Sequence, residues 1–200
     1  MPSPAESPRT KRWTRQECQI IESVGLFAGK KFELIDGELI STMGKNSPHV
    51  ITVVLVHKWL GEIFGLLQVQ QEASIDVATQ DNDLNEPEPD LVVLRQPRTR
   101  YTENPQPHDV LLLVEVSDTT LRFDLKQKAR LYARAGILDY WVLDVNQRRL
   151  IVHREPKDGN YTSVLVYGAE ETIAPLAAPK SPFRVAALLR SEDEVARVVE

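Results

Sequence analysis

Residues 109–117 read DVLLLVEVS, and this run of aliphatic side chains predicts a buried central β-strand. Successive side chains of a strand point to opposite faces of its sheet, so the run divides into two sets. One face is expected to receive Leu111, Leu113, Glu115 and Ser117, and the other Val110, Leu112, Val114 and Val116. The carboxylate of Glu115 therefore shares a face with leucines.

A glutamate in such a place needs a partner or a proton. Burying an unpaired carboxylate costs several kcal/mol, so the group is protonated, ion-paired or bound to a metal. The strand alone leaves these three solutions open. For Glu115 taken by itself, a buried ion pair with a lysine or arginine is the ordinary explanation.

The composition is that of one globular domain. The chain has 200 residues, of which 42% are hydrophobic and 26% charged, and no stretch approaches the ~20 apolar residues of a membrane helix. We expect a soluble, cytoplasmic protein without a membrane partner. Residues 1–13 are expected to be a flexible arm, 14–190 a single domain and 191–200 an acidic tail.

Charge and cysteine content limit the function further. The net charge of −5 argues against a general nucleic-acid coat protein, because binding of phosphates without sequence preference relies on clustered Lys and Arg. The basic run from Arg122 to Arg134 is most simply a solvated face. The single cysteine, Cys18, can form neither an intramolecular disulfide nor a cysteine-based zinc site.

Capping and turn signals predict the N-terminal elements. Thr14 is a candidate N-cap for a helix that ends near residue 24. Asp36-Gly37 between two apolar runs predicts a hairpin over residues 31–42. Ser47-Pro48 opens a second helix, which is expected to end near Phe64.

The rest of the chain alternates between strands and helices. Strands are predicted over residues 66–79, 89–95, 109–117, 137–145, 148–155 and 161–168, and helices over 124–135 and 183–190. The helix 124–135 is long enough to join two parallel strands by a crossover. This order predicts a mixed α/β fold with a C-terminal antiparallel meander.

The helix 124–135 also supplies a candidate partner for Glu115. A wheel of about 100° per residue places Lys128 on the same arc as Leu125, Ala129 and Tyr132, whereas Lys126, Arg130 and Arg134 lie on the opposite, solvated face. Lys128 therefore points towards the sheet.

Asp90 opens the strand that precedes the strand of Glu115. If the two strands are neighbours, both carboxylates reach one end of the sheet, where they repel each other unless a cation lies between them. Mg²⁺ fits such an oxygen site. The residues thus allow a magnesium site with an inward lysine, which suits phosphodiester hydrolysis.

Two blocks make the chain resemble a known family. The segments PEPDLVVL and LLLVEVSDTTLRFDLKQKARLYARAGILDYWVLD, together with FELIDGELI and SPHV, resemble a large bacterial family of restriction-endonuclease-like proteins within the PD-(D/E)xK nuclease superfamily. The resemblance covers roughly residues 14–190. It implies a restriction-endonuclease-like core.

The resemblance assigns roles to named residues. Asp90 matches the aspartate of the PD element and Glu115 the acid of the (D/E)xK element, while Ser117 stands where the strict motif has lysine. Lys128 matches the family's lysine on the following helix. The resemblance also implies that the Val116 carbonyl joins the metal shell, and it gives accessory roles to Glu38 and His49. Asp124 could belong to the site, but a role as the N-cap of the helix also explains it.

The residues and the resemblance together imply a divalent-metal-dependent DNA endonuclease. Asp90 and Glu115 would bind Mg²⁺, with Mn²⁺ as a substitute, and Lys128 would assist water attack. The alternatives are a catalytically silent binding or regulatory protein of the same fold, and a nuclease that acts on RNA or branched DNA. Base rates favour a homodimer.

Overall fold

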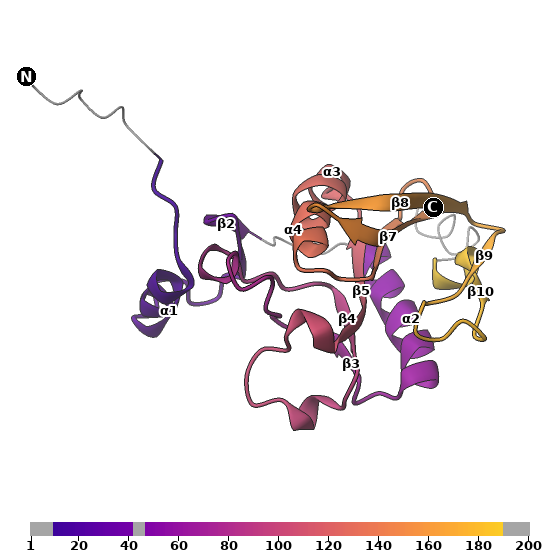
Figure 1. Cartoon of the computed structure of the whole chain (residues 1–200), viewed down its shortest axis with the longest axis horizontal. Coiled ribbons are helices and arrows are strands. Elements are labelled where there is room, and N and C mark those ends of the chain that lie inside the picture. Colours follow the sequence, from indigo (N-terminus) through magenta and orange to yellow (C-terminus); the bar gives the residue numbers. More distant parts are fainter. Residues whose placement is uncertain (1–9, 42–46, 190–200) are drawn as a thin grey trace, which may run out of the picture.

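A six-stranded sheet forms the centre of the computed structural model, which describes residues 10–41 and 47–189 (Figure 1). The strands follow the order β3-β4-β5-β6-β7-β8. They are β3 (Val69–Gln71), β4 (Leu91–Leu94), β5 (Val110–Ser117), β6 (Asp139–Asp144), β7 (Arg149–Lys157) and β8 (Asn160–Gly168). β5 and β6 pair in parallel, and the other neighbours pair antiparallel. The mixed sheet confirms the predicted α/β fold. β4 and β5 are neighbours, which is the condition for Asp90 and Glu115 to reach one end of the sheet.

The central strand β5 is the predicted one, with one irregularity. Leu112, Val114 and Val116 pack on one face, and Leu113 packs on the other, as alternation requires. The register with β4 shifts between Val93 and Leu94, so that Leu111 is an extra residue in β5. The faces predicted for Val110 and Leu111 are therefore wrong, because a bulge reverses the alternation at the start of the strand.

Helices cover both faces of the sheet (Figure 1). Helix α2 (Ser47–Phe64) has its predicted bounds. Gly65 follows its last residue, with a φ of 92° that only glycine adopts readily. The opposite face is covered by one helical segment made of α3 (Leu121–Phe123), a π-helical turn (Asp124–Lys128) and α4 (Ala129–Arg134). Each face thereby gains a separate apolar core, with the Glu115 side of β5 under the helical segment.

The helical segment begins earlier than predicted and ends as predicted. It starts at Leu121, so Asp124 lies inside it and is not its N-cap. Gly136 follows its end with φ 76°, and the Ile137 amide donates to the Tyr132 carbonyl. This is the Schellman arrangement that a C′ glycine allows.

The N-terminal elements form as the sequence predicts. Helix α1 (Arg15–Ser23) begins with a capping box between Thr14 and Glu17. Strands β1 (Phe32–Ile35) and β2 (Glu38–Ser41) form the hairpin around Asp36-Gly37. The Trp13 amide donates to the Gly37 carbonyl, so the described end of the predicted arm contacts this turn.

Two segments differ from the prediction. Within residues 66–79 only β3 is a strand, because Glu72 has a φ of 48° and the amides of Ile75 and Asp76 donate to loop carbonyls instead of a ladder. The predicted helix 183–190 begins instead with β10 (Phe183–Arg184), which pairs with β9 (Thr172–Ile173). A 3₁₀ turn, Val185–Leu188, follows.

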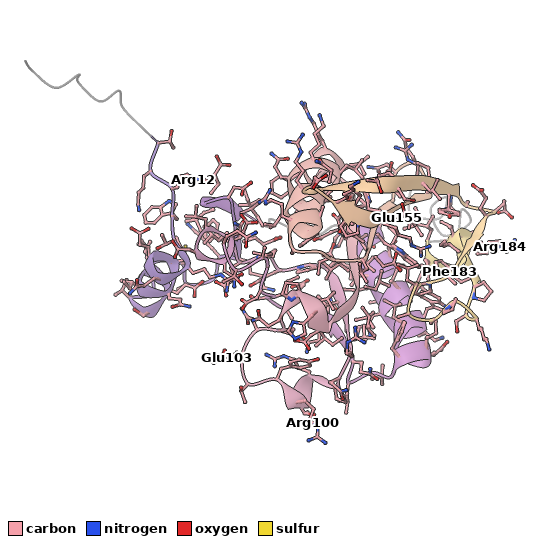
Figure 2. All side chains as sticks on the ribbon, viewed as in Figure 1. Arg12, Arg100, Glu103, Glu155, Phe183 and Arg184 are labelled. Carbon is pink, nitrogen blue, oxygen red and sulfur yellow. The ribbon has the colours of Figure 1, made fainter. Side chains whose placement is uncertain are left out.

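Phe183 packs the β9–β10 hairpin against α2. Its ring lies 4.1 Å from that of Trp59, between the C-terminal hairpin and α2 (Figure 2). Residues 1–9 of the predicted arm, the predicted tail 191–200 and position 190 lie outside the described residues. None of the helices described has the length and apolar character needed to cross a membrane.

Candidate active site

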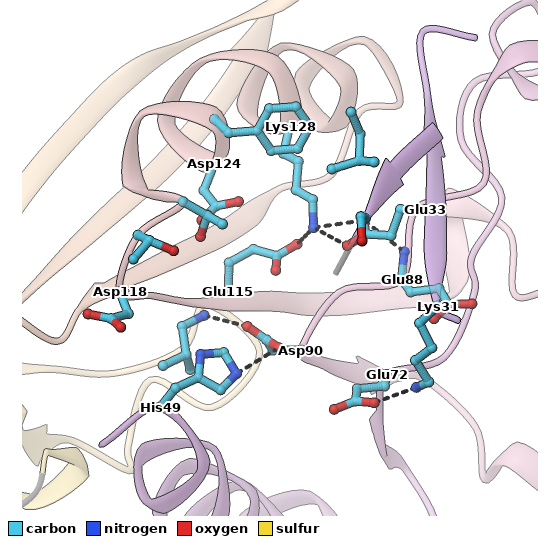
Figure 3. Close-up of a pocket in the computed structure, with 16 residues that line it drawn as sticks. Lys31, Glu33, His49, Glu72, Glu88, Asp90, Glu115, Asp118, Asp124 and Lys128 are labelled. Carbon is cyan, nitrogen blue, oxygen red and sulfur yellow. Dashed lines mark hydrogen bonds and ion pairs between the residues drawn. The ribbon is translucent and has the colours of Figure 1, made fainter. Parts of the chain in front are cut away.

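Strand pairing brings Asp90 and Glu115 to the same end of the sheet. Leu91 of β4 lies opposite Val114 of β5 in an antiparallel register, so the next positions outward are Asp90 and Glu115. Residues directly opposite in such a pair project to the same face with Cβ atoms about 5 Å apart. Both side chains line one cavity of about 410 Å³ (Figure 3).

Backbone and side-chain groups fix the Asp90 carboxylate. Its Oδ2 accepts a hydrogen bond of 2.8 Å from the Val116 amide, and His49 Nε2 lies 3.3 Å from Oδ1. His49 is in the first turn of α2 and lines the same cavity. The structure thus places His49 against Asp90, where it can orient that carboxylate.

Lys128 reaches Glu115 from the π-helical turn. Its ammonium lies 2.9 Å from Glu115 Oε1 and 2.8 Å from Glu33 Oε2, and all three side chains are buried (Figure 3). Tyr132, one turn further along, donates a hydrogen bond of 3.1 Å to the same Glu115 oxygen. π-turns inside α-helices are frequent at functional sites, and here the turn contains the buried lysine.

Glu33 is the site residue that the sequence analysis missed. It lies in β1, is 5% exposed and lines the cavity, whereas Glu38 of β2 is exposed and is not among the lining residues described. Glu33 pairs with Ile40 and Glu38 pairs with Ile35, so both glutamates lie on the same face of the hairpin, with Glu38 next to the Asp36-Gly37 turn. Glu33 stands in the apolar run FELI, so the argument applied to Glu115 would have found it.

Ser117 and Asp124 form a buried pair beside the lysine. Ser117 Oγ donates a 2.6 Å hydrogen bond to Asp124 Oδ2, and Thr120 Oγ1 donates to the same oxygen over 2.7 Å. Burial raises the pKa of Asp124, although Lys128 and the two hydroxyls oppose the shift. Ser117 therefore holds an acid at the position where the strict motif has lysine.

The cavity carries a surplus of acid. Its described lining includes seven acidic side chains and two lysines; the acids are Glu33, Glu72, Glu88, Asp90, Glu115, Asp118 and Asp124, and the lysines are Lys31 and Lys128. Burial raises the pKa of Glu115 well above its ordinary value; Lys128 opposes the shift and the nearby acids add to it. A cation would relieve this repulsion.

Lys128 is a cation in this setting. Burial disfavours its charge, but the carboxylates of Glu115, Glu33 and Asp124 outweigh burial and raise the pKa of Lys128 above its ordinary value. A lysine held in this form cannot serve as a general base. It can donate hydrogen bonds and stabilise negative charge.

The donor set suits a hard divalent cation. Asp90 and Glu115 offer carboxylate oxygens, and Val116 lines the same cavity and offers its carbonyl. Proteins commonly hold Mg²⁺ by one or two carboxylates together with water. Within residues 10–41 and 47–189, no three His, Cys, Asp or Glu side chains form a ready-made metal cluster. The fit rests on the oxygen chemistry and on the acid surplus.

Comparisons with known proteins identify the family and the fold of this chain. Residues 16–185 match the model of the Uma2 family, whose description is "Putative restriction endonuclease". The chain belongs to this family. Among curated proteins, none matches.

A solved structure supports the family fold. It is described as a putative nuclease belonging to DUF820 from Anabaena variabilis, and it is similar to this chain with a TM-score of 0.60 and 11% sequence identity. The similarity covers 78% of this chain and 88% of the other. At this identity the match shows the restriction-endonuclease-like fold alone.

Proposed function

We propose that this Uma2-family protein is a divalent-metal-dependent DNA endonuclease. The observation that carries the proposal is the convergence of Asp90, Glu115 and Lys128 in one acid-rich cavity at the end of β4 and β5. Asp90, Glu115 and the Val116 carbonyl would hold Mg²⁺, or Mn²⁺ in its place. The bound ion would lower the pKa of a water molecule and polarise a phosphate oxygen.

The protein's own groups then have distinct tasks. Lys128 is a fixed ammonium that stabilises negative charge developing on the phosphate, because its pKa keeps it protonated. Glu33 and Tyr132 position this machinery, since Glu33 holds Lys128 and Tyr132 holds Glu115. The Val116 amide and His49 orient Asp90.

Cleavage assays test the proposal. Purified protein is incubated with supercoiled, linear and single-stranded DNA in Mg²⁺ or Mn²⁺, beside Glu115→Gln and Lys128→Ala. The controls are Glu22→Gln and Lys58→Ala, which make the same chemical changes at exposed positions away from the cavity lining. We expect metal-dependent cleavage that both site variants lose and both controls keep. Nicking that survives Glu115→Gln would show that the activity lies elsewhere.

One observation favours a second function. Lys128 already joins Glu115 to Glu33, so these two buried carboxylates have a cation without any metal. A catalytically silent binding or regulatory protein could keep such a network for its fold. Uncleaved DNA in every metal condition, with a folded parent, would favour this function. Cleavage of RNA or branched DNA alone would redirect the proposal to those substrates.

A further inference from the structure

A second hollow adjoins the candidate active site and carries the opposite charge. Its volume is about 590 Å³, and it shares Thr119, Thr120 and Phe123 with the acidic cavity. The remaining lining is mainly basic: Arg122, Lys126, Gln127, Arg130, Arg134 and one acid, Asp36. We call these residues and the three shared ones the basic groove. A chain that crosses the groove would continue directly into the cavity.

Three cations of the groove are uncompensated. Arg122, Lys126 and Arg130 are exposed, and none forms an ion pair or hydrogen bond through its side chain with another residue that the structure describes. Arg134 differs, because it lies 2.8 Å from Asp81 and 3.4 Å from Asp36 and is half-buried. The prediction that Arg134 is solvated is wrong for this reason. Arg134 also neutralises Asp36, which is the one acid of the groove.

The spacing places the three cations in a row. They lie four residues apart in one helical segment, and like charges at this spacing disfavour a helix. A rise of 1.5 Å per residue makes the row about 12 Å long. Neighbouring cations lie about 6 Å apart, and successive phosphates follow one another along a DNA strand at a similar spacing, so each cation can contact one phosphate.

We propose that the basic groove binds the phosphate backbone of the DNA strand and leads it to the acidic cavity. The inference rests on the proposed function for its choice of DNA, but it makes a separate claim about binding. The acidic cavity repels phosphate in a protein whose net charge is −5. Positive charge beside the cavity supplies the attraction that the cavity lacks.

Binding without metal tests the groove apart from catalysis. Fluorescence anisotropy in EDTA measures the affinity of the full chain for a short labelled DNA duplex across a series of salt concentrations. The groove variant combines Arg122→Gln, Lys126→Gln and Arg130→Gln. The control variant combines Lys58→Gln, Arg100→Gln and Lys180→Gln, which removes equal charge from exposed sites outside the groove; Figure 2 shows Arg100 at the end of the molecule away from α3.

The expected result is a change in salt dependence. The loss of three phosphate contacts makes the slope of log affinity against log salt shallower by about 2.7. The ratio of the parent's affinity to that of the groove variant therefore grows about 40-fold as salt falls from about 200 to about 50 mM. The control variant should keep the parental slope. Equal slopes for the groove and control variants would overturn the proposal, and so would a parent that does not bind DNA.

The same experiment separates this inference from the proposed function. A groove variant that loses binding in a protein without nuclease activity would leave the inference standing and refute the enzyme. A parent that cleaves DNA beside a groove variant with parental binding would refute the inference alone. Tighter binding of an RNA duplex than of the DNA duplex would contradict the choice of DNA.

Discussion

Replacing Lys128 by methionine should strongly destabilise the folded protein. Methionine keeps most of the side-chain length but removes the ammonium that joins Glu115 and Glu33. Both carboxylates are at most 5% exposed, so water would solvate them only weakly in place of the lost cation. Lys128→Met therefore leaves two buried acids facing one another.

The size of the effect follows from the contacts. Removing one partner of a buried ion pair typically costs 3–5 kcal/mol, because the other charge is left uncompensated. We expect about 4 kcal/mol for Lys128→Met. Adding Glu33→Gln removes one of the two stranded charges and supplies an amide donor, so the double variant should recover about half of the loss.

Urea unfolding followed by tryptophan fluorescence measures these changes, since Trp141 is fully buried and stacks on Trp59. Lys126→Met is the matched control, because Lys126 lies two residues away but is exposed, and it should change the free energy of unfolding by less than about 0.5 kcal/mol. A loss below about 1 kcal/mol for Lys128→Met, or a double variant less stable than the single one, would refute the reasoning.

Three further changes have defined outcomes. Tyr132→Phe removes the hydroxyl that donates to Glu115 and should lower the free energy of unfolding by about 2 kcal/mol in urea titrations. Burial lowers the pKa of His153 from 6.5 to about 4, so below about pH 6.5 the unfolded chain binds a proton that the folded protein does not. Stability should therefore fall by up to about 3 kcal/mol as pH drops from 6.5 to 4, and His153→Phe should remove this part of the loss, measured by unfolding at each pH. Gly136→Ala meets no neighbouring atom but forces alanine to a φ of 76°, which should cost about 1–2 kcal/mol in the same assay.

Each of these predictions has a contradicting result. An unchanged stability of Tyr132→Phe would mean that its hydroxyl adds nothing to the buried network. Equal pH profiles for the parent and His153→Phe would mean that another group causes the acid sensitivity. A Gly136→Ala variant as stable as the parent would mean that the helix end can relax.

The sequence predicted most of the fold because its signals are local. The capping residue Thr14 and the Asp36-Gly37 turn each fix their own few residues of backbone, and the structure has both as predicted. The aliphatic run of residues 109–117 also identified β5 as a central strand. These patterns need no knowledge of distant contacts.

The differences arise where distant contacts decide the local structure. The bulge at Leu111 depends on the register with β4, which no feature within β5 reveals. The helical segment begins early, at Leu121, and contains a π-helical turn. As a result Asp124 faces Ser117, the last residue of β5. Helical periodicity still placed Lys128 on the inner face, because one π-helical turn changes the direction of the later side chains by only a fraction of a turn about the helix axis.

The candidate site was only partly visible for a related reason. Asp90, Glu115 and Lys128 stand in distinctive local patterns, and the structure brings all three to one cavity. Glu33 reaches Lys128 across 95 positions of sequence, so its contact depends on how the hairpin packs against the helix. Glu38 lies on the same face of this hairpin but next to its turn, where it is exposed.

Anomalous diffraction from crystals soaked in Mn²⁺ tests the metal site most directly. We predict one strong peak in the acidic cavity, with Asp90 and Glu115 oxygens and the Val116 carbonyl at about 2.2 Å, and no peak there in crystals of Asp90→Asn. A cavity without a peak at saturating Mn²⁺, with Lys128 still bridging Glu115 and Glu33, would contradict metal-dependent catalysis at this site.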